Sequence, residues 1–226
     1  MTMLSYNDDP GFASRFRAEM REHSEQDHLM RTSYGEECSD GVWRGCAIGC
    51  AVRSLDRITG ASGREIWDYD DHALVAARLG IPHQIAHVVD RIFEGLPLPL
   101  ALEWPCRFAD SLPVGRDLTM LWPRLAVWIL TDPDHRVTRR AAEARAIAAL
   151  YERRIAGDEP TRDEWFAGTE EDTAAAYARA AAFDGETGYA VRDAIRAALA
   201  AAQCSMSPAD WYRACADKLI ALMESA

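Results

Sequence analysis

Apolar residues recur every three or four positions along most of the chain, which is the spacing of an amphipathic α-helix. Stretches in which apolar and polar residues alternate, the pattern of a β-strand, are nearly missing. We therefore expect an all-α fold, a bundle of about eight to ten helices in orthogonal or mixed packing. The expected helices span residues 12–30, 42–55, 64–79 and 82–95, a brief helix within 97–116, an apolar helix ending at Thr131, and Ala-rich helices over 135–156, 162–182, 188–203 and 208–224.

Capping signals set several of these boundaries. Pro82 occupies a favoured first-turn position, and Gly95 lies where glycine commonly ends a helix. Thr161 begins a capping-box pattern with a glutamate three residues later, and Ser207 stands directly before Pro208 as a capping residue before a first-turn proline. Proline residues at 99, 105 and 113 are expected to break the region between 97 and 116 into turns.

The chain becomes rich in alanine after the segment 132–134, which has the sequence Asp-Pro-Asp and is the clearest linker candidate. We expect an N-terminal helical part over 10–131 and an Ala-rich C-terminal part over 134–226 that packs on it, with one continuous domain as the alternative. Alanine favours helices but buries little area, so the second part is expected to act as a scaffold.

Charge and composition restrict the classes of partner. The chain has 226 residues and a net charge of -11, which argues against binding to nucleic-acid phosphates. No apolar stretch approaches the roughly 20 residues that a membrane span needs, and the first ten residues carry no signal-peptide pattern. A cytoplasmic protein is expected, with a small molecule or another protein as partner, while the oligomeric state is not encoded in any pattern.

The first helix places polar groups on its apolar face. Phe16 and Met20 lie on that face, and His23 and Asp27 fall within the same arc of roughly 80°. Burying either group without a partner would cost about 2 to 7 kcal/mol or more. Two interpretations remain open, a structural pair that ties helices together and a functional pocket.

A second polar strip lies on the helix over 82–95, opposite its apolar face. His83 and His87 have the i, i+4 spacing of two imidazoles that bind one metal ion. Asp90 and Glu94 extend the strip, and a divalent cation would relieve their mutual repulsion. The alternative is an ordinary solvated helix face.

The third unusual segment, residues 43–53, is apolar on nearly every side. Gly45 and Gly49 predict the close approach of another backbone or of a ligand. Cys46, Cys50 and Arg53 share one face, where an arginine could activate a partly exposed thiol. The alternative is that both cysteines fill a tight helix crossing and that Arg53 pairs with Asp27 or Glu94. The acidic run that ends at His72 is expected to be a solvated helix start.

The common nucleotide-binding, zinc-protease and hydrolase motifs are missing from the sequence. We therefore expect a polar pocket where the first, second and fourth helices meet, binding a small ligand or a divalent metal ion, with metal-assisted hydrolysis as its chemistry. Its expected wall is formed by His23, Asp27, Glu94, Arg53, Cys46 and Cys50, with His83, His87 and Asp90 as metal ligands. The alternative is a non-enzymatic interaction or scaffold protein that meets a partner near Trp104, Trp122 and Trp128.

Several short segments form a pattern that can be compared with other sequences. They are His23, Asp27, Gly45-Cys46-Ala47-Ile48-Gly49-Cys50, Gly80-Ile81-Pro82, Asp90, Phe93-Glu94-Gly95-Leu96, Trp104-Pro105, Gly115-Arg116-Asp117-Leu118 and the tail 216–222. In these segments the sequence is similar to a group of uncharacterised bacterial proteins with a Gly-Cys-Ala-Ile/Val-Gly-Cys segment. The resemblance implies membership of an independent family and no catalytic role for any residue, because no activity is known for that group.

Overall fold

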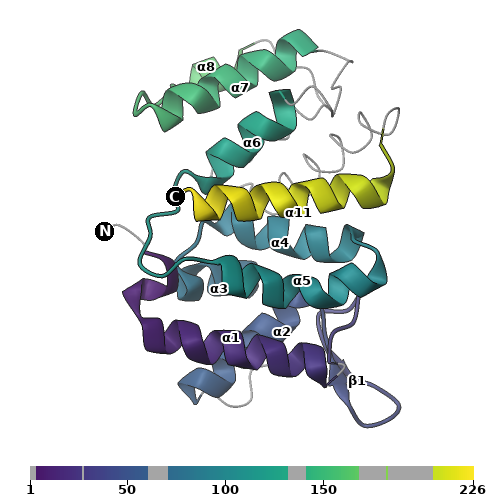
Figure 1. The fold of residues 1–226 in the computed structure, drawn as a ribbon. Helices are drawn as coiled ribbons and strands as arrows, with labels where there is room; N and C mark the ends of the chain where they lie inside the picture. Colours follow the sequence, from purple (N-terminus) through teal and green to yellow (C-terminus); the bar gives the residue numbers. More distant parts are fainter. Residues whose placement is uncertain (1–3, 27, 61–70, 132–140, 168–181, 183–205) are drawn as a thin grey trace. The chain divides into compact units, whose positions relative to one another are not determined.

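The computed structural model describes residues 4–26, 28–60, 71–131, 141–167, 182 and 206–226. Within them the chain is all-α, as predicted, with nine α-helices, one short 3-10 helix and one small hairpin (Figure 1). The elements are η1 (Ser5–Asp8), α1 (Pro10–Glu25), β1 (Glu36–Glu37), β2 (Trp43–Arg44), α2 (Ala47–Thr59), α3 (Asp71–Leu79), α4 (His83–Gly95), α5 (Leu98–Ser111), α6 (Leu121–Thr131), α7 (Ala141–Ile155), α8 (Arg162–Phe166) and α11 (Pro208–Glu224).

Local capping chemistry explains several of the boundaries. The side chain of Asp9 accepts hydrogen bonds from the first backbone N–H groups of α1. The predicted capping box at Thr161 is present at the start of α8. The predicted cap at Ser207 is confirmed as well, because its hydroxyl oxygen accepts the N–H of Asp210 at 3.2 Å at the start of α11.

The segment that was expected to be helical from residue 42 begins with a hairpin instead. Strands β1 and β2 pair antiparallel, and the turn between them has Gly41 at a φ of 76°. The Asp40-Gly41 dipeptide is a hairpin signal in its own right, because glycine adopts a positive φ without strain. Helix α2 starts only at Ala47, and Cys46 is its N-cap residue.

The expectation that Pro99 and Pro105 break residues 97–116 into turns is wrong, whereas the helix expected within this region is present and ends before Pro113. Helix α5 runs without interruption from Leu98 to Ser111, although Pro105 lies inside it. Pro99 lies in the first turn, where no backbone N–H is needed. Tertiary packing outweighs the hydrogen bond lost at Pro105, since the neighbouring Trp104 is buried and its indole N–H donates to the carbonyl of Val89 at 2.9 Å.

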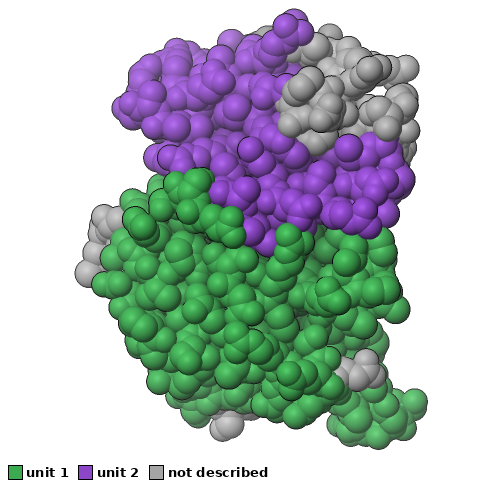
Figure 2. Space-filling model, in the orientation of Figure 1, with its two compact units in different colours: residues 1–119, 223–226 green, residues 120–222 purple. Residues whose placement is uncertain are grey.

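The chain divides into two compact units, residues 1–119 with 223–226, and residues 120–222 (Figure 2). This division places α6 with the C-terminal half, whereas the predicted linker at 132–134 lies outside the described residues. In the first unit α1 packs on α2 and α5, and α3 and α4 pack on each other and on α2. In the second unit α6 packs on α7, where the indole N–H of Trp122 donates to the hydroxyl of Tyr151 at 3.0 Å.

Candidate functional site

His23 lies inside the first unit, as its place on the apolar face of α1 predicts. Its side chain is fully buried, and its Nε2 atom has no hydrogen-bond partner among the described residues. Its Nδ1 atom lies 3.3 Å from Nδ1 of His28. Burial lowers the pKa of His23 to about 3, and the positive charges of Arg57 and Arg53 add to this effect. The imidazole is therefore neutral at physiological pH.

The structure divides the predicted pocket wall into two groups. Arg53 places its guanidinium 4.4 Å from the ring centre of Trp43, near His23, and burial lowers its pKa. Glu94 instead accepts the backbone N–H of Thr32 at 3.0 Å and 3.1 Å with its two carboxylate oxygens. Asp27, the expected partner of His23, lies outside the described residues. The contacts of the described residues thus place His23 with Arg53 and leave Glu94 in separate surroundings.

Both cysteines of the Gly/Cys segment are buried and protonated. Burial raises the pKa of Cys50 to about 12, and it raises the pKa of Cys46 well above its usual value, with the charge of Asp90 adding to the effect. The structure therefore supports small interior side chains over the activated thiol that the neighbouring arginine suggested.

The polar strip of α4 is partly buried. His83, His87, Asp90 and Glu94 are all half-buried. The two imidazoles of α4 turn toward each other, with Nε2 of His83 lying 3.1 Å from Nε2 of His87. Burial lowers the pKa of His87 to about 3, and its neighbouring histidines contribute, so that this ring is neutral.

A third histidine joins this group from α3. His72 is 4% exposed, and its ring stacks on that of His87 with ring centres 3.9 Å apart and an angle of 12° between the planes. Its Nε2 atom lies 3.4 Å from Oδ2 of Asp90, and its Nδ1 atom lies 3.3 Å from the hydroxyl of Tyr34. The expectation of a solvated helix start is wrong here, because both Asp71 and His72 are buried against α4 and its surroundings. We name His72, His83, His87, Asp90 and Tyr34 the histidine cluster.

Sequence reasoning missed His72 and Tyr34 as members of this cluster. Tyr34 comes from the segment 31–35, which folds back onto the start of α2. The N–H of Cys46 donates to the carbonyl of Ser33 at 2.8 Å, and a Cβ atom at Gly49 would lie only 1.5 Å from the carbonyl oxygen of Tyr34. The prediction that Gly49 permits close approach of another backbone is thus confirmed. The backbone that approaches is that of Tyr34.

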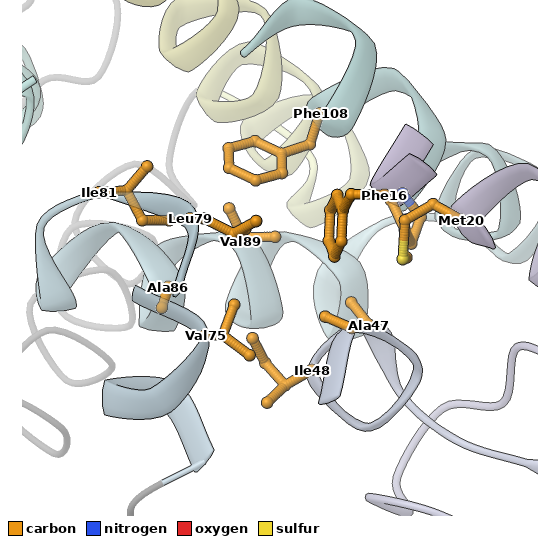
Figure 3. A pocket seen from close by; sticks show the side chains of 12 residues that line it. Phe16, Met20, Ala47, Ile48, Val75, Leu79, Ile81, Ala86, Val89 and Phe108 are labelled. Carbon is orange, nitrogen blue, oxygen red and sulfur yellow. The ribbon is translucent and has the colours of Figure 1, made fainter. Parts of the chain in front are cut away.

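A cavity of about 20 Å³ lies within the first unit, between side chains of α1 to α5 (Figure 3). Phe16 and Met20 of α1 lie on one side of it and Leu79 and Ile81 on the other, and the rest of its lining is apolar too. Among the described residues, none of the predicted polar wall residues lines this cavity, although Ala47 and Ala51, the chain neighbours of Cys46 and Cys50, do. A space of this size and polarity holds no metabolite, so it is a packing defect of the core.

Within the described residues, no three His, Cys, Asp or Glu side chains converge in a way that would hold a metal ion. None of the described helices combines the length and the apolar character that crossing a bilayer requires. A comparison with protein-family models finds no match, and no curated protein and no solved structure is significantly similar to the chain.

Proposed function

We propose that the protein binds one divalent transition-metal ion through His83 and His87. The observation that carries this proposal is the convergence of their Nε2 atoms at 3.1 Å from positions i and i+4 of α4. Two nitrogen ligands at about 2.0 to 2.1 Å from a tetrahedral metal ion lie about 3.4 Å apart, so a small rotation of either ring creates the pair of ligands.

The electrostatic state of His87 favours a cation. A metal ligand must be a neutral imidazole, and burial already keeps His87 in that form at physiological pH. Half-buried Asp90 and Glu94 lie further along the same helix and supply negative charge. Zinc, copper and nickel ions prefer imidazole nitrogen, so we propose an ion of that class.

Two protein ligands leave coordination positions open for water or for a substrate. A bound cation lowers the pKa of a coordinated water, and a nearby carboxylate can act as base, so the chemistry that this arrangement suits is hydrolysis. Asp90 is a carboxylate that contacts the stacked histidine rings, with its Oδ2 atom 3.4 Å from Nε2 of His72.

Calorimetric titration of tag-free protein with zinc chloride tests this proposal. We expect one binding site in the wild type and at least about tenfold weaker binding in His83→Ala and His87→Ala. His28→Asn is the matched control, because it removes a histidine outside the histidine cluster and should leave zinc binding unchanged. Equal affinity in all four proteins, or no binding to any of them, would exclude the site.

The alternative is a scaffold protein that meets a partner near Trp104, Trp122 and Trp128. It requires these tryptophans to be accessible, and two of them are not. Trp104 and Trp122 are buried in the two units, at 1% and 2% exposure. Trp128 stacks on Trp211 within the second unit, with ring centres 5.8 Å apart. Among the described residues, the large apolar side chains that are exposed are Tyr34 and Leu98.

A further inference from the structure

We propose that Asp90, His72 and Tyr34 form a hydrogen-bonded relay that makes the Tyr34 hydroxyl a nucleophile toward uncharged acyl esters. The three side chains are contributed by α4, α3 and the segment 31–35, and they touch in that order. This activity needs no metal ion, so it goes beyond the proposed zinc site and can be tested separately from it.

The contacts define the roles of the three groups. A carboxylate only accepts hydrogen bonds, so the Nε2–H of His72 donates to Asp90 and the Nδ1 atom keeps its lone pair. That lone pair faces the Tyr34 hydroxyl, which donates its proton to it. A nucleophile next to a base that a third group orients is the general arrangement for covalent catalysis. The distances of 3.3 Å and 3.4 Å are typical of such hydrogen bonds before a substrate draws them together.

Solvent exposure increases along the relay from His72, the base, to Tyr34, the nucleophile. His72 is 4% exposed and is covered on one side by the ring of His87, so bulk water does not compete for its nitrogen atoms. Tyr34 is the exposed end of the relay, at 37% exposure against 4% for His72. The remaining carboxylate oxygen of Asp90, Oδ1, is buried and has no hydrogen-bond partner within the described part of the chain.

The backbone beside Tyr34 is held in a strained position. Thr32 has a φ of 71°, an uncommon conformation for a β-branched residue. Its N–H is bound by the carboxylate of Glu94, while the Ser33 carbonyl accepts the N–H of Cys46. Strain of this kind persists only where the surroundings fix the backbone, and it is concentrated at functional sites. The side chain of Tyr34 thus projects from an anchored segment.

Charge indicates the class of electrophile. The chain has a net charge of -11, which disfavours phosphate esters and other anions overall. Near the relay the carboxylates of Asp90 and Glu94 are accompanied by Arg31 and Arg91. An uncharged carboxylic ester is the electrophile that these surroundings admit.

The proposed step is a transfer of the acyl group to oxygen. The Tyr34 oxygen forms a bond to the ester carbonyl carbon while its proton moves to Nδ1 of His72. The bond from that carbon to the leaving oxygen then breaks, and His72 returns the proton to the leaving alcohol or phenol. Water, deprotonated by the same nitrogen, releases the acid and restores the tyrosine hydroxyl.

The test uses 4-nitrophenyl acetate as the probe, in the presence of EDTA. We expect an acetyl group on Tyr34, located by peptide mass spectrometry, and none on the buried tyrosines 6, 151 and 212. The native protein should acquire it at least about tenfold faster than urea-unfolded protein, and His72→Asn should lose that advantage. Tyr34→Phe should lose the adduct itself.

Asp90 acts as a positioning residue. Its role is therefore tested by the position of the proton on the His72 ring, in addition to the acetylation rate. Nitrogen NMR of the His72 ring should show the proton on Nε2 in the wild type, and Asp90→Asn should abolish this preference and slow acetylation of Tyr34. His28→Asn is the matched control, because it removes a histidine outside the histidine cluster and should acetylate at the wild-type rate. An unmodified Tyr34, or equal rates in the wild type, His72→Asn and Asp90→Asn, would overturn the relay and leave the zinc proposal untouched.

Discussion

Lowering the pH from 7 to 5 is expected to remove about 2 kcal/mol of folding stability through His23 alone. Burial lowers the pKa of this imidazole from 6.5 to about 3 in the folded protein. The unfolded chain therefore takes up a proton near pH 6.5, whereas the folded protein takes it up only near pH 3. The stability that the neutral ring provides is fully present above pH 6.5 and is lost as the pH falls toward 3.

Urea denaturation at pH 7, 6 and 5 measures this loss. His23→Asn keeps a polar atom near His28 and cannot titrate in this range, so its loss between pH 7 and 5 should be about 2 kcal/mol smaller than that of the wild type. Met20→Leu is the matched control, since it alters a buried neighbour on the same face of α1 and retains His23. An identical pH dependence in the wild type and His23→Asn would show that the ring is not held neutral in the interior.

The sequence predicted those features that depend on neighbouring residues. Helix α4 ends at Gly95, the predicted position, but without a left-handed glycine cap, because Leu96 is the C-cap residue. The caps at Thr161 and Ser207 are present, because capping is decided within one helical turn. The burial of His23 followed from its position on the apolar stripe of α1. Helix α1 is nevertheless shorter than expected and ends at Glu25.

The composition of the site depended on contacts between distant segments. His72 was placed in solvent because α3 begins with charged residues, yet its ring stacks on His87 of α4. Tyr34 belongs to a segment without a helical pattern, and only the folded backbone brings its hydroxyl to His72. Glu94 turned out to hold Thr32 instead of facing His23, since the rotation of α4 about its axis is set by packing against α2, α3 and α5.

The substitution Gly49→Ala is expected to destabilise the protein by about 3 kcal/mol, although alanine is the better helix former by about 1 kcal/mol. Gly49 lies in the first turn of α2, where its added Cβ atom would lie 1.5 Å from the carbonyl oxygen and 2.7 Å from the carbonyl carbon of Tyr34. Both atoms belong to the backbone, so no rotamer change relieves the overlap. The segment 31–35 must move away from α2.

The displacement of the segment 31–35 is expected to disrupt the histidine cluster, because Tyr34 belongs to both. Displacing Tyr34 breaks the hydrogen bond between Cys46 and Ser33 and withdraws the Tyr34 hydroxyl from His72. We therefore expect Gly49→Ala to lower both the midpoint of urea denaturation and the rate at which Tyr34 is acetylated, the latter by at least about tenfold.

Gly60→Ala is the matched control on the same helix. Gly60 caps the C-terminus of α2 at a φ of 72°, and a Cβ atom there would meet nothing within 4 Å. Its substitution costs only the backbone strain of a positive φ, about 1 to 2 kcal/mol, and leaves Tyr34 in place. The two variants thus separate general destabilisation of α2 from displacement of the tyrosine, because only Gly49→Ala should slow acetylation. A Gly49→Ala protein as stable and as reactive as the wild type would show that the segment 31–35 does not rest on α2.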